Sequence, residues 1–174
     1  MKQLILVIVL ILVATAAAAN QHMENPMRQL DGMIGKWQCK GIAYATPWFP
    51  EHPTAADVRE EWILDGKWVS FTYAEKKTAA NPTPFTVTGY SGYDPELKMY
   101  VVGSVDSMGG YATGAGSGWT GDVMTFEGPW HLGGMTAKSR DTFTKKGANE
   151  MVHVGELEYE GKWMKLGQET CTRK

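Results

Sequence analysis

Three glycines in the middle of the chain, Gly116, Gly118 and Gly121, have the G-x-G-x-x-G spacing of a dinucleotide-binding loop. Such a loop follows a strand and opens a helix, because the pyrophosphate binds at the helix N-terminus. The segment that comes next, 122–128, is typical of another short strand with a turn. We therefore interpret 116–121 as a hairpin connection and not as a phosphate-binding loop.

Small residues also mark one face of the strand that we expect at 111–119. They occupy every second position: Gly110, Ala112, Gly114, Gly116 and Gly118. Facing inward, they would leave room for a ligand or a neighbouring tryptophan. Facing outward, they would allow sharp curvature or the close approach of another backbone. We favour the inward orientation.

The four histidines do not stand at metal-ligand spacing. They are His22, His52, His131 and His153. No H-x-H, H-E-x-x-H or C-x-x-C motif occurs, so we predict no metal site. His153 shares strand parity with apolar residues such as Met151 and Leu157, which would point it into a core. It is then either a hydrogen-bonded core histidine or a ligand contact.

Arg140 is the candidate for binding an anionic group. It alternates with Lys138 and Thr142, a set that fits either a solvated outer face or the polar lining of a cavity. Facing inward, Arg140 would suit a ligand carboxylate, because its guanidinium binds carboxylates with two parallel hydrogen bonds. An enzyme would need such an interior cluster, for example His153 with Arg140 and a carboxylate such as Glu156, although Glu156 has the opposite strand parity from His153.

The remaining acidic and nucleophilic residues give no catalytic pattern. Asp57, Glu60 and Glu61 are expected on a charged strand surface beside Arg59. No two carboxylates stand in environments that would separate their pKa values, as acid and base roles require. Serines lie near glycines at several places, but none fits G-x-S-x-G. We therefore predict no catalytic residue.

The N-terminus has the layout of a secretory signal peptide. One cation, Lys2, precedes an apolar run at 4–13, and the small residues at 14–19 supply a cleavage site before Asn20. We expect residues 1–19 to be removed and 20–174 to form one domain in the periplasm or outside the cell. The chain is weakly acidic, with a formal net charge of −2 and no basic run. We therefore expect no nucleic-acid partner, and no membrane contact after cleavage.

Short strands separated by turn residues follow a single helical segment. Asn25 and Pro26 are suited to begin a short helix over 25–34, as N-cap and first helical residue. Ten strands are expected at 35–45, 57–64, 67–76, 84–93, 98–105, 111–119, 122–128, 135–143, 149–159 and 162–173. Because hairpins join most of them, we predict an all-β, up-and-down antiparallel barrel, closed so that no sheet edge remains exposed.

The two cysteines test this closure. Cys39 lies in the first expected strand and Cys171 in the last. With an even number of strands, these two run antiparallel where they meet, at a separation that suits a disulfide. The alternative is a pair of buried free thiols. We favour the disulfide.

Aromatic residues indicate what the interior holds. Phe71 and Tyr73 alternate with polar positions, and Trp62 lies on one face of the preceding strand. In a barrel these faces line the interior, where eight to ten strands enclose either a packed core or a small ligand. We therefore predict ligand contacts from Trp62, Phe71 and Tyr73, together with Arg140 and His153.

Longer stretches of the chain resemble a known family. The series LDGMIGKW, LDGKWVSFTY, GYDPELKMYVVGSVDSMGG, MTFEG, SRDTF and the terminal TRK is similar to the bacterial family called domain of unknown function 1579, whose members are small lipocalin-like barrels. The opening GKWQCKG also resembles the G-x-W strand of lipocalins and fatty-acid-binding proteins. That resemblance implies that Trp37 closes one barrel end and that Arg173 stacks over it.

A more distant resemblance is to nitrobindin-like haem barrels, which share the G-x-W start. Those proteins bind haem through a histidine close to the C-terminus, whereas residues 155–174 contain none and Met164 or Lys165 stands about where the ligand would be. This departure argues against a haem site of that type, and haem held in another way stays open. We predict no cofactor.

The function expected from the sequence is that of an exported barrel that binds a small apolar or amphipathic molecule. The alternative is a structural or interaction protein with a filled core, for which Trp48 and Phe49 in a proline-rich loop would be the contact surface. An enzyme with residues assembled inside the barrel is the third interpretation.

Overall fold

The structure, a computed structural model, describes residues 25–174. The expected signal peptide at 1–19 and His22 lie outside the described residues. Within the described part, no helix has the length and apolar character needed to cross a membrane.

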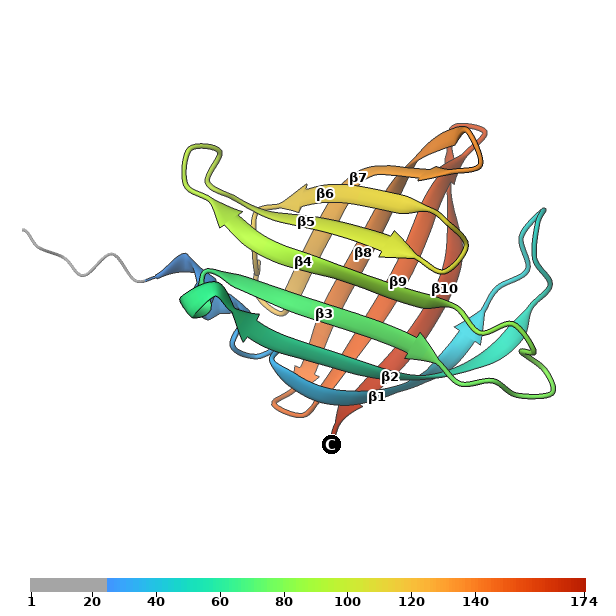
Figure 1. Ribbon diagram of the computed structural model, residues 1–174, viewed down its shortest axis with the longest axis horizontal. Coiled ribbons are helices and arrows are strands. Elements are labelled where there is room, and N and C mark those ends of the chain that lie inside the picture. Colours follow the sequence, from blue (N-terminus) through green and yellow to red (C-terminus); the bar gives the residue numbers. More distant parts are fainter. Residues whose placement is uncertain (1–24) are drawn as a thin grey trace, which may run out of the picture.

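Ten antiparallel strands follow one another around a closed barrel (Figure 1). They are β1 (Gly35–Ala43), β2 (His52–Ile63), β3 (Trp68–Glu75), β4 (Thr86–Asp94), β5 (Met99–Asp106), β6 (Tyr111–Gly116), β7 (Val123–Leu132), β8 (Met135–Gly147), β9 (Glu150–Tyr159) and β10 (Lys162–Arg173). Each strand pairs with its neighbours in sequence, and β1 pairs with β10. The predicted all-β, ten-stranded, up-and-down barrel is confirmed.

Three strands are longer than the sequence predicted. β2 begins at His52 and includes Pro53, which the prediction left in a loop. Residues 52–55 pair with β1, whereas pairing with β3 starts at Ala56, so the missing N–H of Pro53 interrupts no ladder on the β3 side. β7 continues through the PWHL segment to Leu132, beyond the strand predicted at 122–128. β8 runs to Gly147, beyond the strand predicted at 135–143, because a register shift between Lys145 and Gly147 absorbs the extra residue.

A short helix covers one end of the barrel. It is the 3-10 helix η1 (Pro26–Leu30), shorter than the predicted segment but starting where predicted, with the Asn25 side chain accepting a hydrogen bond from the Met27 N–H at 3.1 Å. The hydroxyl of Tyr100 donates to the carbonyl of Pro26 and the indole N–H of Trp119 donates to Gln29, which hold η1 against the strands. A second 3-10 turn, η2 (Leu64–Gly66), joins β2 to β3.

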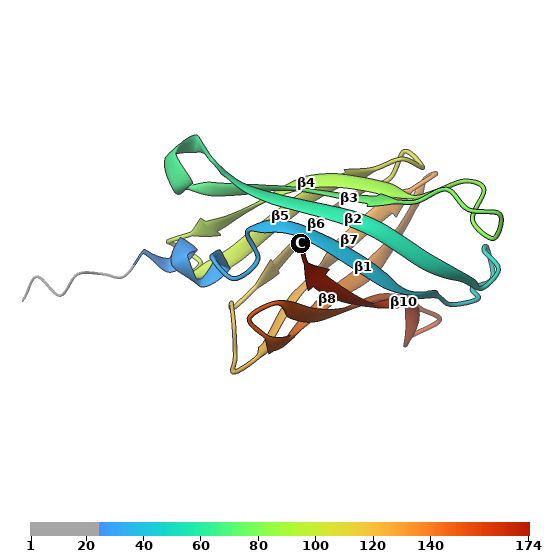
Figure 2. The ribbon, with the colours of Figure 1, turned by 90° about the horizontal axis from the view of Figure 1, so that it is seen from below.

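The seam between the first and last strands carries the two cysteines. Figure 2 shows β1 beside β10, and the register places Cys39 opposite Cys171. Their sulfurs form a disulfide between positions separated by 132 residues in sequence. The bridge thus fixes the closure of the barrel covalently.

Trp37 and Arg173 also lie opposite each other at this seam. The guanidinium of Arg173 lies 4.2 Å from the centre of the Trp37 ring and donates to the carbonyls of Gly32 and Ile34. The indole N–H of Trp37 donates to the carbonyl of Met33 at 2.7 Å. The two residues therefore stack where the chain enters the barrel, in the arrangement that the resemblance to lipocalins implied.

Candidate functional site

The strand register defines which residues face the barrel interior, because cross-strand partners point to the same face of a sheet. Val69, which is buried in the core, lies opposite Trp62 of β2 and Ser91 of β4. Phe71 and Tyr73 follow at every second position of β3 and point the same way. Trp62, Phe71 and Tyr73 thus line the interior wall.

The barrel is filled at the end covered by η1. Nine buried side chains form one cluster there: Met27, Leu30, Met33, Trp37, Val69, Tyr100, Met124, Phe126 and Met151. They come from η1 and the segment after it, and from strand positions near that end. A ligand cannot enter this packed region without displacing well-packed side chains.

Small residues face inward further along the strands, toward the other end. Those that share the inner face by register are Gly41, Ala56, Gly89, Ser104, Ala112, Gly114, Gly128, Ser139, Gly155 and Gly167. At Gly155 an added Cβ would meet one atom within 4 Å, the Oδ1 of Asp141 at 3.7 Å. The space beside Gly155 is thus open, whereas an added Cβ on Gly41, Gly89 or Gly128 would lie within 2.3 Å of a backbone oxygen.

The bare face of β6 points inward, as we expected. Gly114 and Gly116 lie opposite the inner residues Val102 and Tyr100. An added Cβ on Gly116 would lie 2.0 Å from the carbonyl oxygen of Thr125 on β7. The glycine therefore permits close backbone approach, the effect that we had linked to the outward orientation.

A histidine and an aspartate face each other inside the barrel. Nε2 of His153 lies 2.8 Å from Oδ1 of Asp141, and the His153 ring stacks on Phe143 with ring centres 4.7 Å apart. The side chain of Asp141 is 51% exposed and that of His153 27%, although both belong to the inner face. Since an inward side chain can be exposed only to space inside the barrel or at its mouth, water reaches this pair.

The surroundings of His153 favour its protonated form. Burial lowers the pKa of the ring, but the hydrogen bond to Asp141 and the negative charges of Asp141, Glu169 and Glu60 outweigh it and raise the pKa overall. The pair can therefore present a hydrogen-bonded imidazolium and carboxylate to the interior at a higher pH than an isolated histidine would allow.

A chain of hydrogen bonds runs along the inner wall at the open half. Glu169, which is buried, accepts from the Thr54 hydroxyl at 2.6 Å and from the Tyr73 hydroxyl at 3.0 Å. The Tyr73 oxygen also lies 3.3 Å from Glu75, which accepts from the Asn81 side chain at 2.7 Å. Burial and the two adjacent carboxylates raise the pKa of Tyr73, so its hydroxyl stays protonated as the donor that links them.

Glu60 faces inward without a partner. It lies opposite Gly35 of β1 and Phe71 of β3, and no hydrogen bond or ion pair to its carboxylate forms within residues 25–174. Burial raises its pKa from 4.5 to about 8, against the opposing effects of Arg173 and His153. The expectation that Glu60 belongs to a charged outer surface was wrong, whereas Glu61 and Arg59 do form an ion pair there.

Arg140 faces the outside of the barrel. It lies between Glu127 of β7 and Glu156 of β9, and it forms an ion pair with Glu156 at 2.7 Å. Its guanidinium stacks over Trp163 at 4.2 Å. The inward orientation of Arg140 is therefore corrected, and the Arg140–Glu156 pair does not join His153 in the interior. The neighbour in sequence, Asp141, has the inward parity instead.

Sequence reasoning missed three interior acids for which strand parity gave a signal. Glu60 has the parity of Trp62, Asp141 has that of Phe143, and Glu169 has that of Cys171. Glu60 was assigned to a solvated surface because a charged residue on a strand usually is, and Asp141 and Glu169 were not considered. Within the described residues, one group has the mutual distances of metal ligands, Cys39, Cys171 and Glu169, but its two sulfurs are joined to each other.

Shallow hollows lie at the η1 end. One of about 720 Å³ reaches Trp37 and Met151 and is rimmed by Lys145 and Lys146. Another of about 370 Å³ lies beside Trp62 and Glu60. Glu60 thus stands at the boundary between the interior wall and the filled end, where solvent approaches from outside.

Taken together, these features define a closed ten-stranded antiparallel barrel, filled at one end and lined with small, aromatic and acidic residues toward the other. The chain matches the family described as "Protein of unknown function (DUF1579)" over residues 23–173 and belongs to it.

A solved structure of low sequence identity has a similar fold. The crystal structure of Rv2717c from M. tuberculosis aligns with a TM-score of 0.66 and 14% identity, covering 86% of this chain and 97% of that one. A redesigned β-barrel aligns with a TM-score of 0.44 and 12% identity, covering 87% and 97%. No curated protein matches the chain.

Proposed function

We propose that this protein binds a small amphipathic molecule in the half of the barrel away from η1. One observation carries the proposal: the carboxylate of Asp141 points inward and is nevertheless half exposed. A filled core would bury such a group completely or exclude it. Small inward residues beside it, such as Gly155, leave the space that a ligand would occupy.

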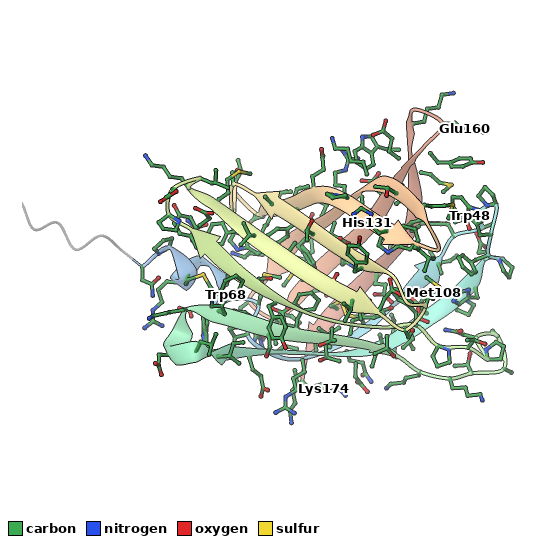
Figure 3. All side chains as sticks on the ribbon, turned by 45° about the horizontal axis from the view of Figure 1, so that its top comes forward. Trp48, Trp68, Met108, His131, Glu160 and Lys174 are labelled. Carbon is green, nitrogen blue, oxygen red and sulfur yellow. A yellow bond between two sulfur atoms is a disulfide. The ribbon has the colours of Figure 1, made fainter. Side chains whose placement is uncertain are left out.

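The mouth of the barrel supports an amphipathic ligand. Apolar side chains are exposed on the connections and strand ends here, namely Trp48, Phe49, Met108, Met135 and Tyr159. Figure 3 shows Trp48 and Met108 at the end away from η1, with Glu160 on another connection there. An apolar rim favours transfer of a hydrocarbon group from water, at about 0.8 kcal/mol for each buried CH₂. The polar inner wall would then meet the ligand's polar group.

A plug in the interior tests the proposal. Gly155→Leu would place a side chain in the open space beside Asp141, and Gly103→Leu is the matched control, because an added Cβ at Gly103 meets nothing within 4 Å and its partner Tyr90 is exposed. The probe is N-phenyl-1-naphthylamine, a neutral dye that fluoresces in apolar surroundings. We expect one dye per wild-type chain, retained binding in Gly103→Leu and loss of binding in Gly155→Leu.

Two results would overturn the proposal. The wild-type protein could leave the dye dark, which would mean that no such cavity accepts an apolar ligand. Alternatively, the two leucine variants could bind the dye equally, which would place the bound dye outside the barrel. Native mass spectrometry of the protein from its own cells then identifies a natural occupant.

We also propose that the protein is exported. The layout of residues 1–19 and the disulfide between Cys39 and Cys171 support this, because disulfides persist mainly in oxidising compartments. We expect the protein recovered from fractionated cells to begin at Asn20 and to lie in the periplasm or the medium. An intact N-terminus in the cytoplasmic fraction would refute export.

The exposed loop residues support a second candidate function, docking to another macromolecule. Trp48 and Phe49 are 41% and 49% exposed, and Trp48 packs edge-on against Tyr159 with ring centres 5.2 Å apart. If this rim is a docking surface, Trp48→Ser will weaken the partner's binding without changing dye binding by the interior. If the rim instead serves ligand entry, Trp48→Ser will slow dye uptake. Pull-downs with the wild-type protein and with the variant will then recover the same proteins.

A further inference from the structure

The outer face of β3 to β6 is almost free of charge. Figure 1 shows these four strands side by side on the near side of the barrel. Among their outward residues, which follow from the cross-strand register, Asp94 alone is charged, and it caps the turn after β4. We call the other outward residues of β3 to β6 the neutral wall. Its exposed members include Trp68, Thr72, Thr88, Tyr90, Val105 and Tyr111.

Charged residues flank the neutral wall on both sides, and they are paired within the chain. On β2, Arg59 and Glu61 form an ion pair with each other, and beyond β6 Glu127 of β7 pairs with Lys138 of β8. Each of these pairs carries no net charge. A surface that lacks charge at its centre and is rich in aromatic residues has the usual composition of a protein–protein contact. The neutral wall therefore indicates a protein partner.

Three rows of cross-strand partners cross the neutral wall. The middle row runs from Ser70 through Tyr90 and Gly103 to Thr113. Tyr90 is 54% exposed, so its side chain projects from the sheet. A Cβ added at Gly103, by contrast, would meet nothing within 4 Å. A projecting ring thus stands directly beside a hollow.

A second copy of the neutral wall fits this arrangement. Consider a twofold axis that lies between two facing walls, parallel to β4 and β5 and midway between them. It places β4 of each copy over β5 of the other, because the two strands are equally far from the axis. Tyr90 then lies over Gly103 of the second copy, and the twofold axis repeats the same contact in the opposite direction. Such a self-matching pair is what a twofold symmetric interface requires.

The other two rows also place large residues over small ones. In the first, Trp68 on β3 lies over Ala115 of the second copy; the Trp68 ring covers Gly92, where an added Cβ would lie 2.7 Å from ring atoms. In the other, Tyr111 on β6 lies over Thr72 of the second copy. The outside of a barrel is convex, so β3 and β6 lie further from the second copy than β4 and β5 do. Trp68 and Tyr111 are large enough to fill this wider gap.

The area of the contact sets its strength. With strands about 4.8 Å apart and a rise of about 3.4 Å per residue, the three rows from β2 to β7 cover about 500 Å² on each copy. Two copies would thus bury about 1,000 Å², which reaches the lower limit of a specific protein–protein interface. The area predicts a dimer that dissociates readily and not a permanent one.

We propose that this protein forms a homodimer in which the neutral walls of two copies pack face to face around a twofold axis between β4 and β5. No charge on the wall opposes this approach, although the chain has a formal net charge of −2. The proposal is independent of the interior ligand, because the wall lies on the side of the barrel and not at its mouth.

Val105→Lys tests the wall, and Val123→Lys is the matched control. Both valines are exposed on outer strand faces, at 56% and 40%, but Val123 lies at the start of β7, outside the neutral wall. Val105 lies beside the proposed axis, so a dimer of Val105→Lys would bring two positive charges together at its centre. By sedimentation equilibrium we expect wild type and Val123→Lys to dimerise in the micromolar range, and Val105→Lys to dimerise at least about tenfold more weakly.

Cross-linking tests the orientation of the two copies. Thr88 lies opposite Val105 across the axis, and facing sheets pack about 10 Å apart. A short bismaleimide should therefore join Thr88→Cys chains to Val105→Cys chains several-fold faster than it joins Thr88→Cys chains to Val123→Cys chains. The described residues contain no free cysteine that would compete.

Three results would overturn the proposal. A wild-type chain that stays monomeric at every concentration up to millimolar would exclude a second copy as the occupant, and its retention by a neutral polysaccharide gel would then assign the wall to a glycan. Equal dissociation constants for Val105→Lys and Val123→Lys would place the dimer contact elsewhere on the barrel. Equal rates of cross-linking in the two cysteine mixtures would refute the axis between β4 and β5.

Discussion

Replacing Glu60 with glutamine should change the pH dependence of stability. The carboxyl faces inward from β2, and burial raises its pKa from 4.5 to about 8. Glutamine has nearly the same shape and removes the ionisation. The comparison of wild-type and variant proteins therefore isolates the cost of placing a negative charge at this position.

The direction in which stability changes with pH follows from which state, folded or unfolded, holds the Glu60 proton. Between pH 4.5 and pH 8 the folded protein keeps Glu60 protonated, whereas the unfolded chain releases the proton, so the unfolded state gains stability as the pH rises. The stabilising effect is complete below the unfolded pKa, declines through this window and stays lost above pH 8. A pKa change from 4.5 to about 8 corresponds to about 5 kcal/mol. Because water reaches the interior, we expect roughly 2–3 kcal/mol to be observed.

Urea denaturation at pH 5, 7 and 9 measures this effect. We expect the two proteins to differ little at pH 5, and Glu60→Gln to exceed wild type by roughly 2–3 kcal/mol in free energy of unfolding at pH 9. Glu61→Gln, on the exposed outer face, should track wild type at every pH. A difference between Glu60→Gln and wild type that stays constant from pH 5 to pH 9 would refute the burial of the carboxyl.

Three further perturbations address the seam and the interior pair. Cys39→Ser should lower the free energy of unfolding by about 2–4 kcal/mol, because the disulfide joins positions separated by 132 residues, and reductant should then have no further effect on a urea melt. Arg173→Ala should lower the free energy of unfolding by roughly 2–3 kcal/mol, because its contacts with the Trp37 ring and with backbone carbonyls are lost. Lys174→Ala removes only a surface ion pair and should cost under about 0.5 kcal/mol in the same urea assay. Equal losses in the two variants would contradict the role of Arg173 in barrel closure. Asp141→Asn should lower the pKa of His153, followed by NMR titration of the ring, and an unchanged titration would exclude the pairing.

Much of the architecture could be predicted because turns and alternation are local properties. Asp65-Gly66 and Glu160-Gly161 mark hairpins directly in the sequence. The predicted strand bounds are wrong where pairing between strands overrides the local preference of turn residues. Pro53 lies in a strand because its stretch of β2 pairs with β1 alone, and the KKG segment continues β8 because a register shift absorbs its extra residue.

Some of the site residues could be placed from the sequence and others could not. Trp62, Phe71 and Tyr73 could be placed on the inner wall because aromatic alternation shows which face of a strand is buried. Arg140 could not, because a strand with polar residues on both faces leaves its inward parity undecided. β8 is such a strand, and the packing of Phe143 against the core defines which of its faces points inward.

The sequence by itself determined the strand order, the up-and-down connections and the position of the cysteines at the two ends of the domain. These depend on residues that are neighbours in the chain. Only the tertiary structure decided that Glu60, Asp141 and Glu169 share one interior with His153. They come from strands far apart in sequence, and strand parity, which gives the face of each carboxylate, does not tell which strands meet across the interior. Closure of the barrel decides which face of each strand points to the interior and which to solvent.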